Sequence, residues 1–135
     1  MKNLRKIILI LFSVLILNTL FSFTPIKKVS EKQWHGIASF YHHKFSGRKT
    51  SSGEIFNNQK YTAANNFLPL GSLVKITNIA NGKSVIVKIN DRMNKNNKRL
   101  IDLSQIAAKE LAIINQGIAQ VSMELIDKEE FFASK

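Results

Sequence analysis

The sequence predicts a mainly β protein, a closed or nearly closed barrel with one short helix. Residues 72–78 and 83–91 form the clearest pair of strands, and Asn81-Gly82 between them tolerates the positive φ angles of a tight hairpin. Several further short strand patterns, but only one credible helix, fall within residues 34–127. A flat sheet built from these strands would leave its edges exposed, so closure is favoured.

The first half of this region alternates between strands and turns. Residues 34–43 (WHGIASFYHH) are rich in aromatic and small residues, which is typical of a strand. Residues 44–54 contain Gly47, Gly53 and many polar residues, which favour turns. Residues 61–71 combine a short apolar piece and an Asn pair with Pro69 and Gly71, which break regular structure.

The strand at residues 84–91 ends on an acid. Val85, Val87 and Ile89 alternate with Ser84, Ile86 and Lys88, so one side of the strand is apolar, and Asp91 is the next residue in the inward-facing phase. A buried carboxylate is costly unless it has partners or lies at the barrel mouth. Asp91 is therefore either a strand terminator bonded to its own turn or an acid–base group at the rim of a cleft.

The second half predicts one helix and a last strand. The helix is followed by Gly117 and can be capped by Asp102 or Ser104, with Gln105 placed as in a capping box. Its apolar face contains Leu103, Ala107, Leu111 and Ile114. In the strand at residues 117–127, one side contains Ala119, Val121, Met123 and Leu125.

The N-terminus reads as a targeting segment. Lys2, Arg5 and Lys6 precede an uncharged apolar run at residues 7–23, as in a secretory signal, although a single-pass membrane anchor competes. We favour the cleaved signal at residues 1–23, followed by a tether at 24–33, a domain at 34–127 and an unassigned tail at 128–135. The chain has no Cys, which excludes disulfides and lipid attachment through a cysteine.

The charge points to an acidic partner. The net charge is +11, and removal of residues 1–23 with their three cations would leave +8. A wall polymer, an anionic lipid surface or nucleic acid would suit this charge. No helix-turn-helix, zinc-finger or RNA-recognition signature appears, so we do not expect nucleic acid.

Metal and nucleophile chemistry find little support. His35, His42 and His43 lie close together, but no Cys and no H-E-x-x-H spacing accompanies them. Adjacent His42 and His43 would face opposite ways in a strand, so we expect no metal site and no cofactor. The sequence also lacks a G-x-S-x-G motif. The other isolated acid is Glu54, which on its own reads as a solvated loop residue.

Four ordered motifs resemble the rare lipoprotein A-like (RlpA-like) family: GRKTSSGE, TAANNFLPLGSLVKITN, NGKSVIVKINDR and IDLS. The similarity covers nearly all of residues 36–125. It implies a six-stranded double-psi β-barrel, the fold shared with expansins, and lytic transglycosylase activity on peptidoglycan strands that lack stem peptides. It also implies that the two essential acids are Glu54 and Asp91.

The resemblance implies particular roles for these residues. One carboxyl group must carry a proton, so we expect a raised pKa, with Asp91 as the preferred general acid and Glu54 as its helper, although the roles can be reversed. We expect no added peptidoglycan-binding repeat domain in the chain. We also expect a monomer that is exported to the periplasm or cell envelope, where envelope or division proteins are possible partners. Substrate contacts are expected from Tyr41, Arg48, Thr62, Asn65 and Arg92. Further cations expected at the cleft edge are Lys95, Lys98 and Arg99.

Two departures from the family bear on activity. The family commonly has His where this chain has Asn65, and Asn cannot shuttle a proton near neutral pH. The usual Gly-Pro after the NDR motif is replaced by Met93-Asn94. A non-catalytic, expansin-like module that binds or loosens wall glycan therefore stays open as the alternative.

Overall fold

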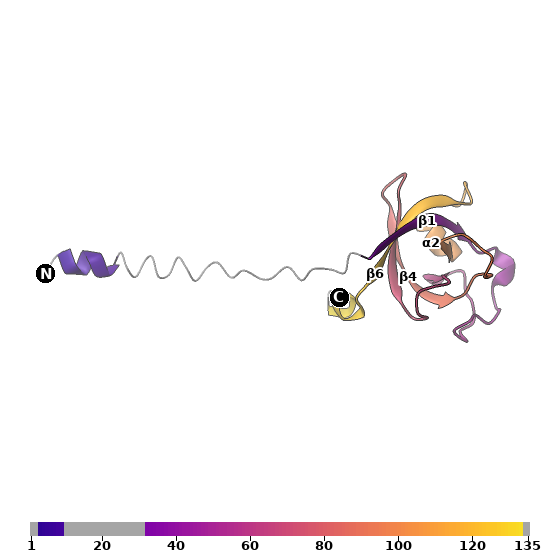
Figure 1. Ribbon diagram of the computed structural model, residues 1–135, viewed down its shortest axis with the longest axis horizontal. Helices are drawn as coiled ribbons and strands as arrows, with labels where there is room; N and C mark the ends of the chain where they lie inside the picture. The colour runs from indigo at the N-terminus through magenta and orange to yellow at the C-terminus, as the bar shows by residue number, and fades with distance from the viewer. Residues whose placement is uncertain (1–2, 10–31, 134–135) are drawn as a thin grey trace.

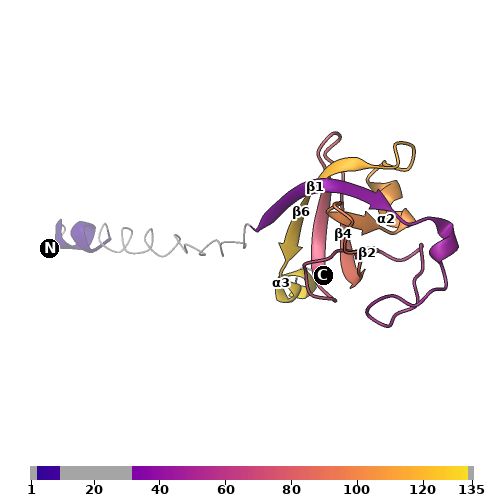
Figure 2. The same cartoon turned by 45° about the vertical axis from the view of Figure 1, so that its right-hand side comes forward.

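A computed structural model of the chain describes residues 3–9 and 32–133, and residues 32–133 form a six-stranded barrel with short helices (Figures 1 and 2). The strands are β1 (Gln33–Phe40), β2 (Thr62–Ala64), β3 (Leu73–Asn78), β4 (Ser84–Asp91), β5 (Ile101–Leu103) and β6 (Ala119–Ile126). The helices are η1 (His43–Phe45), α2 (Gln105–Glu110) and α3 (Lys128–Ala133), and residues 3–9 are also helical.

The strands close in the order β1-β5-β2-β4-β3-β6, which confirms the predicted barrel. Two neighbouring pairs are parallel, β1 with β5 and β2 with β4, and the other four contacts are antiparallel. Parallel neighbours cannot be joined by a tight hairpin, so long connections must cross between them. The connection from β1 to β2, magenta in Figure 2, extends from the barrel and carries the Glu54 region.

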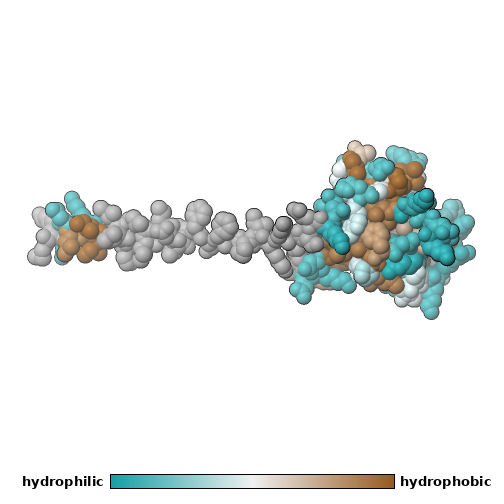
Figure 3. Space-filling model, viewed as in Figure 1, coloured by the Kyte–Doolittle hydropathy of each residue, from teal (hydrophilic) through white to brown (hydrophobic). Residues whose placement is uncertain are grey.

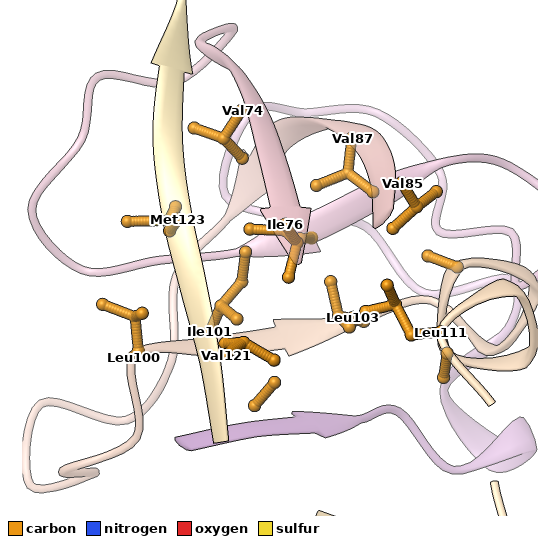
Figure 4. Close-up of a cluster of buried hydrophobic side chains, with 14 of the residues drawn as sticks. Val74, Ile76, Val85, Val87, Leu100, Ile101, Leu103, Leu111, Val121 and Met123 are labelled. Carbon is orange, nitrogen blue, oxygen red and sulfur yellow. The ribbon is translucent and has the colours of Figure 1, made fainter. Parts of the chain in front are cut away.

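The barrel interior is filled by alternating side chains from its strands. Figure 4 shows them pointing toward one another, as expected for a barrel too narrow to hold a channel. The side chains predicted to point inward from β4 before its last residues, Val85, Val87 and Ile89, are all buried. On the predicted inward face of β6, Val121 and Met123 are buried, and Ala119 and Leu125 are partly buried against the same core. Val74 and Ile76 of β3 are buried beside them. The inward face predicted for β6 is thus confirmed, and that of β4 is confirmed as far as Ile89.

The alternation in β4 is broken just before Asp91. Ala63 pairs with Ile89 and Ala64 pairs with Asp91, so Asn90 is an extra residue on the β4 side. Such a bulge re-aims the side chains that follow it. Asn90 is consequently buried and Asp91 is half-exposed. The inward phase expected for Asp91 is therefore wrong, because the bulge shifts it out of register.

The helix predicted from residue 103 onward is shorter than its apolar pattern indicates. Leu103 belongs to β5, which pairs in parallel with β1, and α2 ends at Glu110. The predicted cap residue Ser104 does occupy the N-cap position of α2, but the expected side-chain capping bond is absent. Ser104 makes no side-chain cap bond, and Asn58 accepts instead, through Oδ1 from Gln105 N at 3.0 Å and through O from Ile106 N at 3.1 Å.

The predicted signal or anchor segment lies mostly outside the described residues, since residues 10–31 are not among them. No helix in residues 3–9 or 32–133 is long and apolar enough to cross a bilayer. On the barrel, apolar side chains are scattered among hydrophilic ones on the face in Figure 3. The residues predicted as an unassigned tail include α3.

Candidate active site

Residues 48–56, here called the Glu54 hairpin, fold back on themselves and dock on the end of β4. Thr50 N donates to Glu54 O at 2.8 Å, and Phe56 N donates to Arg48 O at 2.8 Å. Gly53 sits at the turn with φ of 89°, a conformation that favours glycine. Ser52 N donates to Asn90 O at 3.1 Å, which fixes the hairpin beside the β4 bulge.

Asp91 accepts hydrogen bonds on both carboxylate oxygens. Oδ1 accepts from Ser51 N at 3.0 Å, from the Ser51 hydroxyl at 2.8 Å and from Arg92 N at 2.8 Å. Oδ2 accepts from the Tyr41 hydroxyl at 2.8 Å. Partial burial by itself raises the pKa of Asp91, but these hydrogen bonds together lower the pKa below its usual value.

Tyr41 is held as a permanent donor to this carboxylate. Its ring packs on Phe56 with centroids 4.5 Å apart and on Phe45 at 5.7 Å. Burial, then the hydrogen bond and negative charge of Asp91, raise the pKa of Tyr41 well above its usual value. The phenol stays protonated, so it stabilises Asp91 as an anion. Contact between Tyr41 and substrate remains a prediction.

Glu54 is exposed and pairs with the neighbouring part of β4. Its Oε1 lies 2.7 Å from Lys88 Nζ, and its Oε2 accepts from Asn90 Nδ2 at 3.2 Å. The hydrogen bonds from Lys88 and then Asn90 lower the pKa of Glu54. The raised pKa expected for one of the two acids is therefore wrong for the unliganded protein, because both carboxylates are surrounded by donors.

The hairpin brings together two acids that are far apart in the sequence. Ser51 binds Asp91, while Glu54 binds Asn90 and Lys88, so both carboxylates lie against one short stretch of β4. The sequence reasoning isolated both acids but missed their partners. The alternation of β4 could have identified Lys88 as an outward-facing cation available to an acid such as Glu54. The burial of Asn90 could not be foreseen, because it depends on the bulge.

Two of the residues expected to touch substrate are buried. Asn65 is 0% exposed, and Thr62 is 5% exposed with its hydroxyl unpartnered among the described residues. Direct substrate contact by Asn65 and Thr62 is therefore wrong for this arrangement, because both side chains are buried. Asn65 Nδ2 donates to Leu100 O at 2.9 Å, and Oδ1 accepts from Phe67 N and Leu68 N at 3.0 and 2.8 Å.

Asn65 instead positions the residues around the acid. Its N donates to Asp91 O at 3.2 Å, and its O accepts from Arg92 Nη1 at 2.6 Å. Arg92 is half-buried in this contact. The loop after it is fastened by Asn66, whose Oδ1 accepts from Met93 N at 2.8 Å. The Met93-Asn94 sequence is thus accommodated by side-chain bonds to the neighbouring loop.

The remaining predicted cations differ in availability. Arg48 is exposed and lies over the Phe45 ring at 5.2 Å. Lys95 and Lys98 are exposed, and contact with glycan stays a prediction for these three. Arg99 is paired with Asp102 through two hydrogen bonds of 2.7 and 2.9 Å.

The histidines lie in a different arrangement from that expected. His42 and His43 follow the end of β1, and their rings are 4.0 Å apart, so they do not face opposite ways. His42 Nδ1 accepts from Lys44 N at 3.3 Å and caps η1. Within residues 3–9 and 32–133, no group of three or more His, Asp or Glu side chains is placed to bind a metal.

Comparison with known families adds to this geometry. Residues 33–123 match the family model described as lytic transglycolase. The chain belongs to this family. The lytic transglycolase match spans every strand from β1 to most of β6, together with Glu54 and Asp91. The predicted resemblance is thereby confirmed.

Curated relatives of this lytic transglycolase chain carry one name, endolytic peptidoglycan transglycosylase RlpA. The Haemophilus influenzae protein is 52% identical over 91 residues, which are 67% of this chain and 32% of that protein. The Neisseria meningitidis serogroup B protein is 47% identical over 104 residues, covering 77% and 44%. The Pseudomonas aeruginosa PAO1 protein is 41% identical over 114 residues, covering 84% and 33%. The matched residues thus span between 32% and 44% of the length of these relatives.

Solved structures resemble the chain in fold alone. Streptomyces papain inhibitor has a TM-score of 0.57 at 19% identity and covers 72% of this chain and 96% of its own. An expansin of Clavibacter michiganensis has a TM-score of 0.54 at 21% identity and covers 71% and 51%. With the family match and the two parallel strand pairs, the fold is the predicted double-psi β-barrel.

Proposed function

We propose that this protein is a peptidoglycan lytic transglycosylase. It cleaves the β-1,4 bond between MurNAc and GlcNAc in peptide-poor glycan strands and leaves 1,6-anhydro ends. The observation that carries the proposal is the placement of Glu54 and Asp91 at the same end of β4, where each carboxylate accepts hydrogen bonds from its own set of donors. The names of the relatives support the same reaction and substrate.

The reaction needs two proton transfers. The leaving GlcNAc oxygen takes up a proton as the bond to C1 breaks, and the C6 hydroxyl loses a proton as its oxygen closes onto C1. An oxocarbenium-like centre forms between the two events. One carboxyl group must start protonated and the other ionised, so the environments of the two acids decide the roles.

The hydrogen bonds favour the reverse of the preferred assignment. Asp91 has four donors on its oxygens, including the Tyr41 phenol, and therefore remains ionised. In our proposal it faces the cationic centre and accepts the C6 hydroxyl proton. Glu54 is exposed and held by the Lys88 side chain, so bound glycan can displace this cation, which raises the pKa of Glu54 and lets it take up a proton from solvent. Glu54 then donates this proton to the leaving oxygen.

The setting of the reaction follows from the substrate. Peptidoglycan lies outside the inner membrane, so the proposal includes export to the periplasm or envelope, consistent with the apolar run at residues 7–23. The excess of cations suits the lactyl carboxylates of MurNAc. A monomer is sufficient for the site, since all of its residues come from one chain. Contacts with envelope or division proteins remain a prediction.

Product analysis on peptide-free glycan strands tests the reaction. The purified chain is incubated with sacculi from which amidase has removed the peptides, and soluble fragments are identified by mass spectrometry. Fragments with 1,6-anhydro-MurNAc ends are expected. Reducing ends instead would mean hydrolysis and would contradict the proposal.

The alternative function is glycan binding without cleavage. Two observations favour it: both acids have lowered pKa values in the free protein, and Asn65 replaces the histidine common in the family. Under this alternative, the protein is retained on sacculi in a pull-down and no soluble fragment is released. The same incubation therefore distinguishes the two functions.

Replacing Lys88 by methionine is expected to move the alkaline limb of the kcat/KM profile to higher pH. If Glu54 is the proton donor, activity falls as pH rises through its pKa, and Lys88 now holds that pKa low. Loss of the cation raises the pKa and keeps the acid protonated at higher pH. Lys75→Met, on an exposed position of β3, is the control and should leave the limb in place. An unmoved limb in Lys88→Met would exclude Glu54 as donor.

A further inference from the structure

An aromatic pair lies outside the set of residues that the reaction uses. The Trp34 and Phe67 rings have centroids 5.4 Å apart and are tilted by 51°. Trp34 comes from the start of β1 and packs partly on the barrel core. Phe67 comes from the loop between β2 and β3 and remains 53% exposed despite this contact. Contact with Trp34 therefore leaves about half of the Phe67 side chain open to a ligand.

The Phe67 ring is presented by a fixed backbone. Asn65 Oδ1 accepts from Phe67 N at 3.0 Å and from Leu68 N at 2.8 Å, and Asn65 is fully buried. Leu68, the next residue, is buried in the core and anchors the chain after Phe67. A rigid, exposed aromatic side chain loses little conformational entropy when a ligand stacks on it.

The same loop joins the aromatic pair to the candidate active site. Asn65 N donates to Asp91 O at 3.2 Å, and Arg92 Nη1 donates to Asn65 O at 2.6 Å. Only Asn66 separates Asn65 from Phe67 in the chain, so the Cα atoms of Asn65 and Phe67 are at most about 7 Å apart. The backbone of Phe67 is thus close to that of Asp91, at a separation that a few linked sugar rings can bridge.

The charges around the pair match a substrate with carboxylates. Lys32 Nζ lies 5.9 Å from the centroid of the Trp34 ring, and the guanidinium of half-buried Arg92 contacts the backbone of Asn65, two positions before Phe67. A pyranose ring has an apolar face that packs on aromatic side chains and polar edges that face solvent. MurNAc adds a lactyl carboxylate that these cations attract.

We propose that Trp34 and Phe67 form a distal sugar-binding subsite, which holds the glycan strand of peptidoglycan beyond the bond at Asp91 and Glu54. The subsite makes affinity depend on strand length: fragments long enough to reach Phe67 bind more tightly than a single disaccharide. This inference rests on the proposed function for its substrate class, and binding can be measured independently of cleavage.

Trp34 is the only tryptophan in the chain, so its fluorescence reports directly on the proposed subsite. The 135-residue chain carrying Asp91→Asn, which leaves the glycan intact, is titrated with peptide-free MurNAc–GlcNAc oligomers of increasing length. A saturable change in Trp34 emission is expected with long oligomers. Phe67→Ala in the same background should weaken binding of the long oligomers by about three- to tenfold, the range of one aromatic contact.

The controls separate stacking from general loss of apolar surface. Phe132→Ala removes another exposed phenylalanine, 66% exposed on α3, and should leave binding of the long oligomers unchanged. Phe67→Leu keeps apolar bulk without the ring and should weaken binding nearly as much as Phe67→Ala. Phe67→Tyr keeps an aromatic ring and should bind the long oligomers as tightly as the parent. Thermal unfolding of each variant confirms that the fold is retained.

Two results would overturn the subsite. One is equal affinity of the parent and Phe67→Ala for long oligomers. The other is silent Trp34 emission while calorimetry detects binding. Neither bears on cleavage, which is measured with the unmodified chain. Conversely, binding could depend on oligomer length and on Phe67 while the unmodified chain releases no 1,6-anhydro product. That result would support the subsite and reject the proposed transglycosylase activity.

Discussion

Replacing Asp91 by asparagine is expected to lower the release of 1,6-anhydro products at least about 100-fold, as for loss of an acid–base group. The substitution preserves shape but removes the negative charge that we propose faces the cationic centre. It also places an amide where Ser51, Arg92 and Tyr41 all donate. At least one of these donors then loses its acceptor, so the hairpin contact is weakened as well.

Glu54→Gln is expected to cause a loss of similar size for a different reason. Glutamine keeps one oxygen that can accept from Lys88 or from Asn90, but it cannot donate an acidic proton to the leaving oxygen. Because Glu54 is exposed, the fold should be unaffected, and the loss should appear as activity alone. Glu129→Gln, an exposed acid on α3, is the matched control and should keep full activity.

Both variants are assayed by the initial rate of soluble fragment release from peptide-free sacculi, with urea unfolding measured in parallel. Full rates in both would reject the site. If only Asp91→Asn loses activity, the proposed role of the Asp91 charge stands, and Glu54 is not the proton donor. The double variant should be no worse than the more damaged single one, because residues that act in one step are not additive.

The sequence was most informative where local pattern and burial agree. The strands β3, β4 and β6 were predicted because their side chains alternate over six to eight residues. The three-residue strands β2 and β5 were not, since each depends on partners from distant parts of the chain. Leu103 fits a helical face and a strand equally well, and only pairing with Phe40 of β1 decides between them.

The candidate site was predicted in part for the same reason. Glu54 and Asp91 stood out as isolated acids that each had an ordinary structural explanation, and only the family motifs favoured a catalytic role for both. Their ionisation could not be predicted, because the donors to each carboxylate come from elsewhere in the chain. The Asp91 donors include Ser51 and Tyr41, 40 and 50 residues away. Burial alone would raise the pKa of Asp91, whereas these bonds reverse the direction.

Asn65→Ala is expected to lower the free energy of unfolding by at least about 2 kcal/mol, since each buried polar group left unpaired costs about 1–3 kcal/mol. The side chain of Asn65 satisfies Phe67 N, Leu68 N and Leu100 O, all within the protein. Urea unfolding followed by Trp34 fluorescence measures the change. Asn57→Ala removes an exposed Asn that accepts a single bond from Gln59 N, and should cost less than about 1 kcal/mol.

Two further substitutions at position 65 test whether its buried bonds hold the loop beside Asp91. Asn65→Asp should recover part of the stability lost in Asn65→Ala, because its carboxylate still accepts from Phe67 N and Leu68 N. The recovery should be incomplete, because the carboxylate cannot donate to Leu100 O. Asn65→His, the residue common in the family, should restore one donor and one acceptor. If Asn65→Ala unfolds at the same urea concentration as the parent chain, the buried bonds of Asn65 do not hold the loop, and its place next to Asp91 requires another explanation.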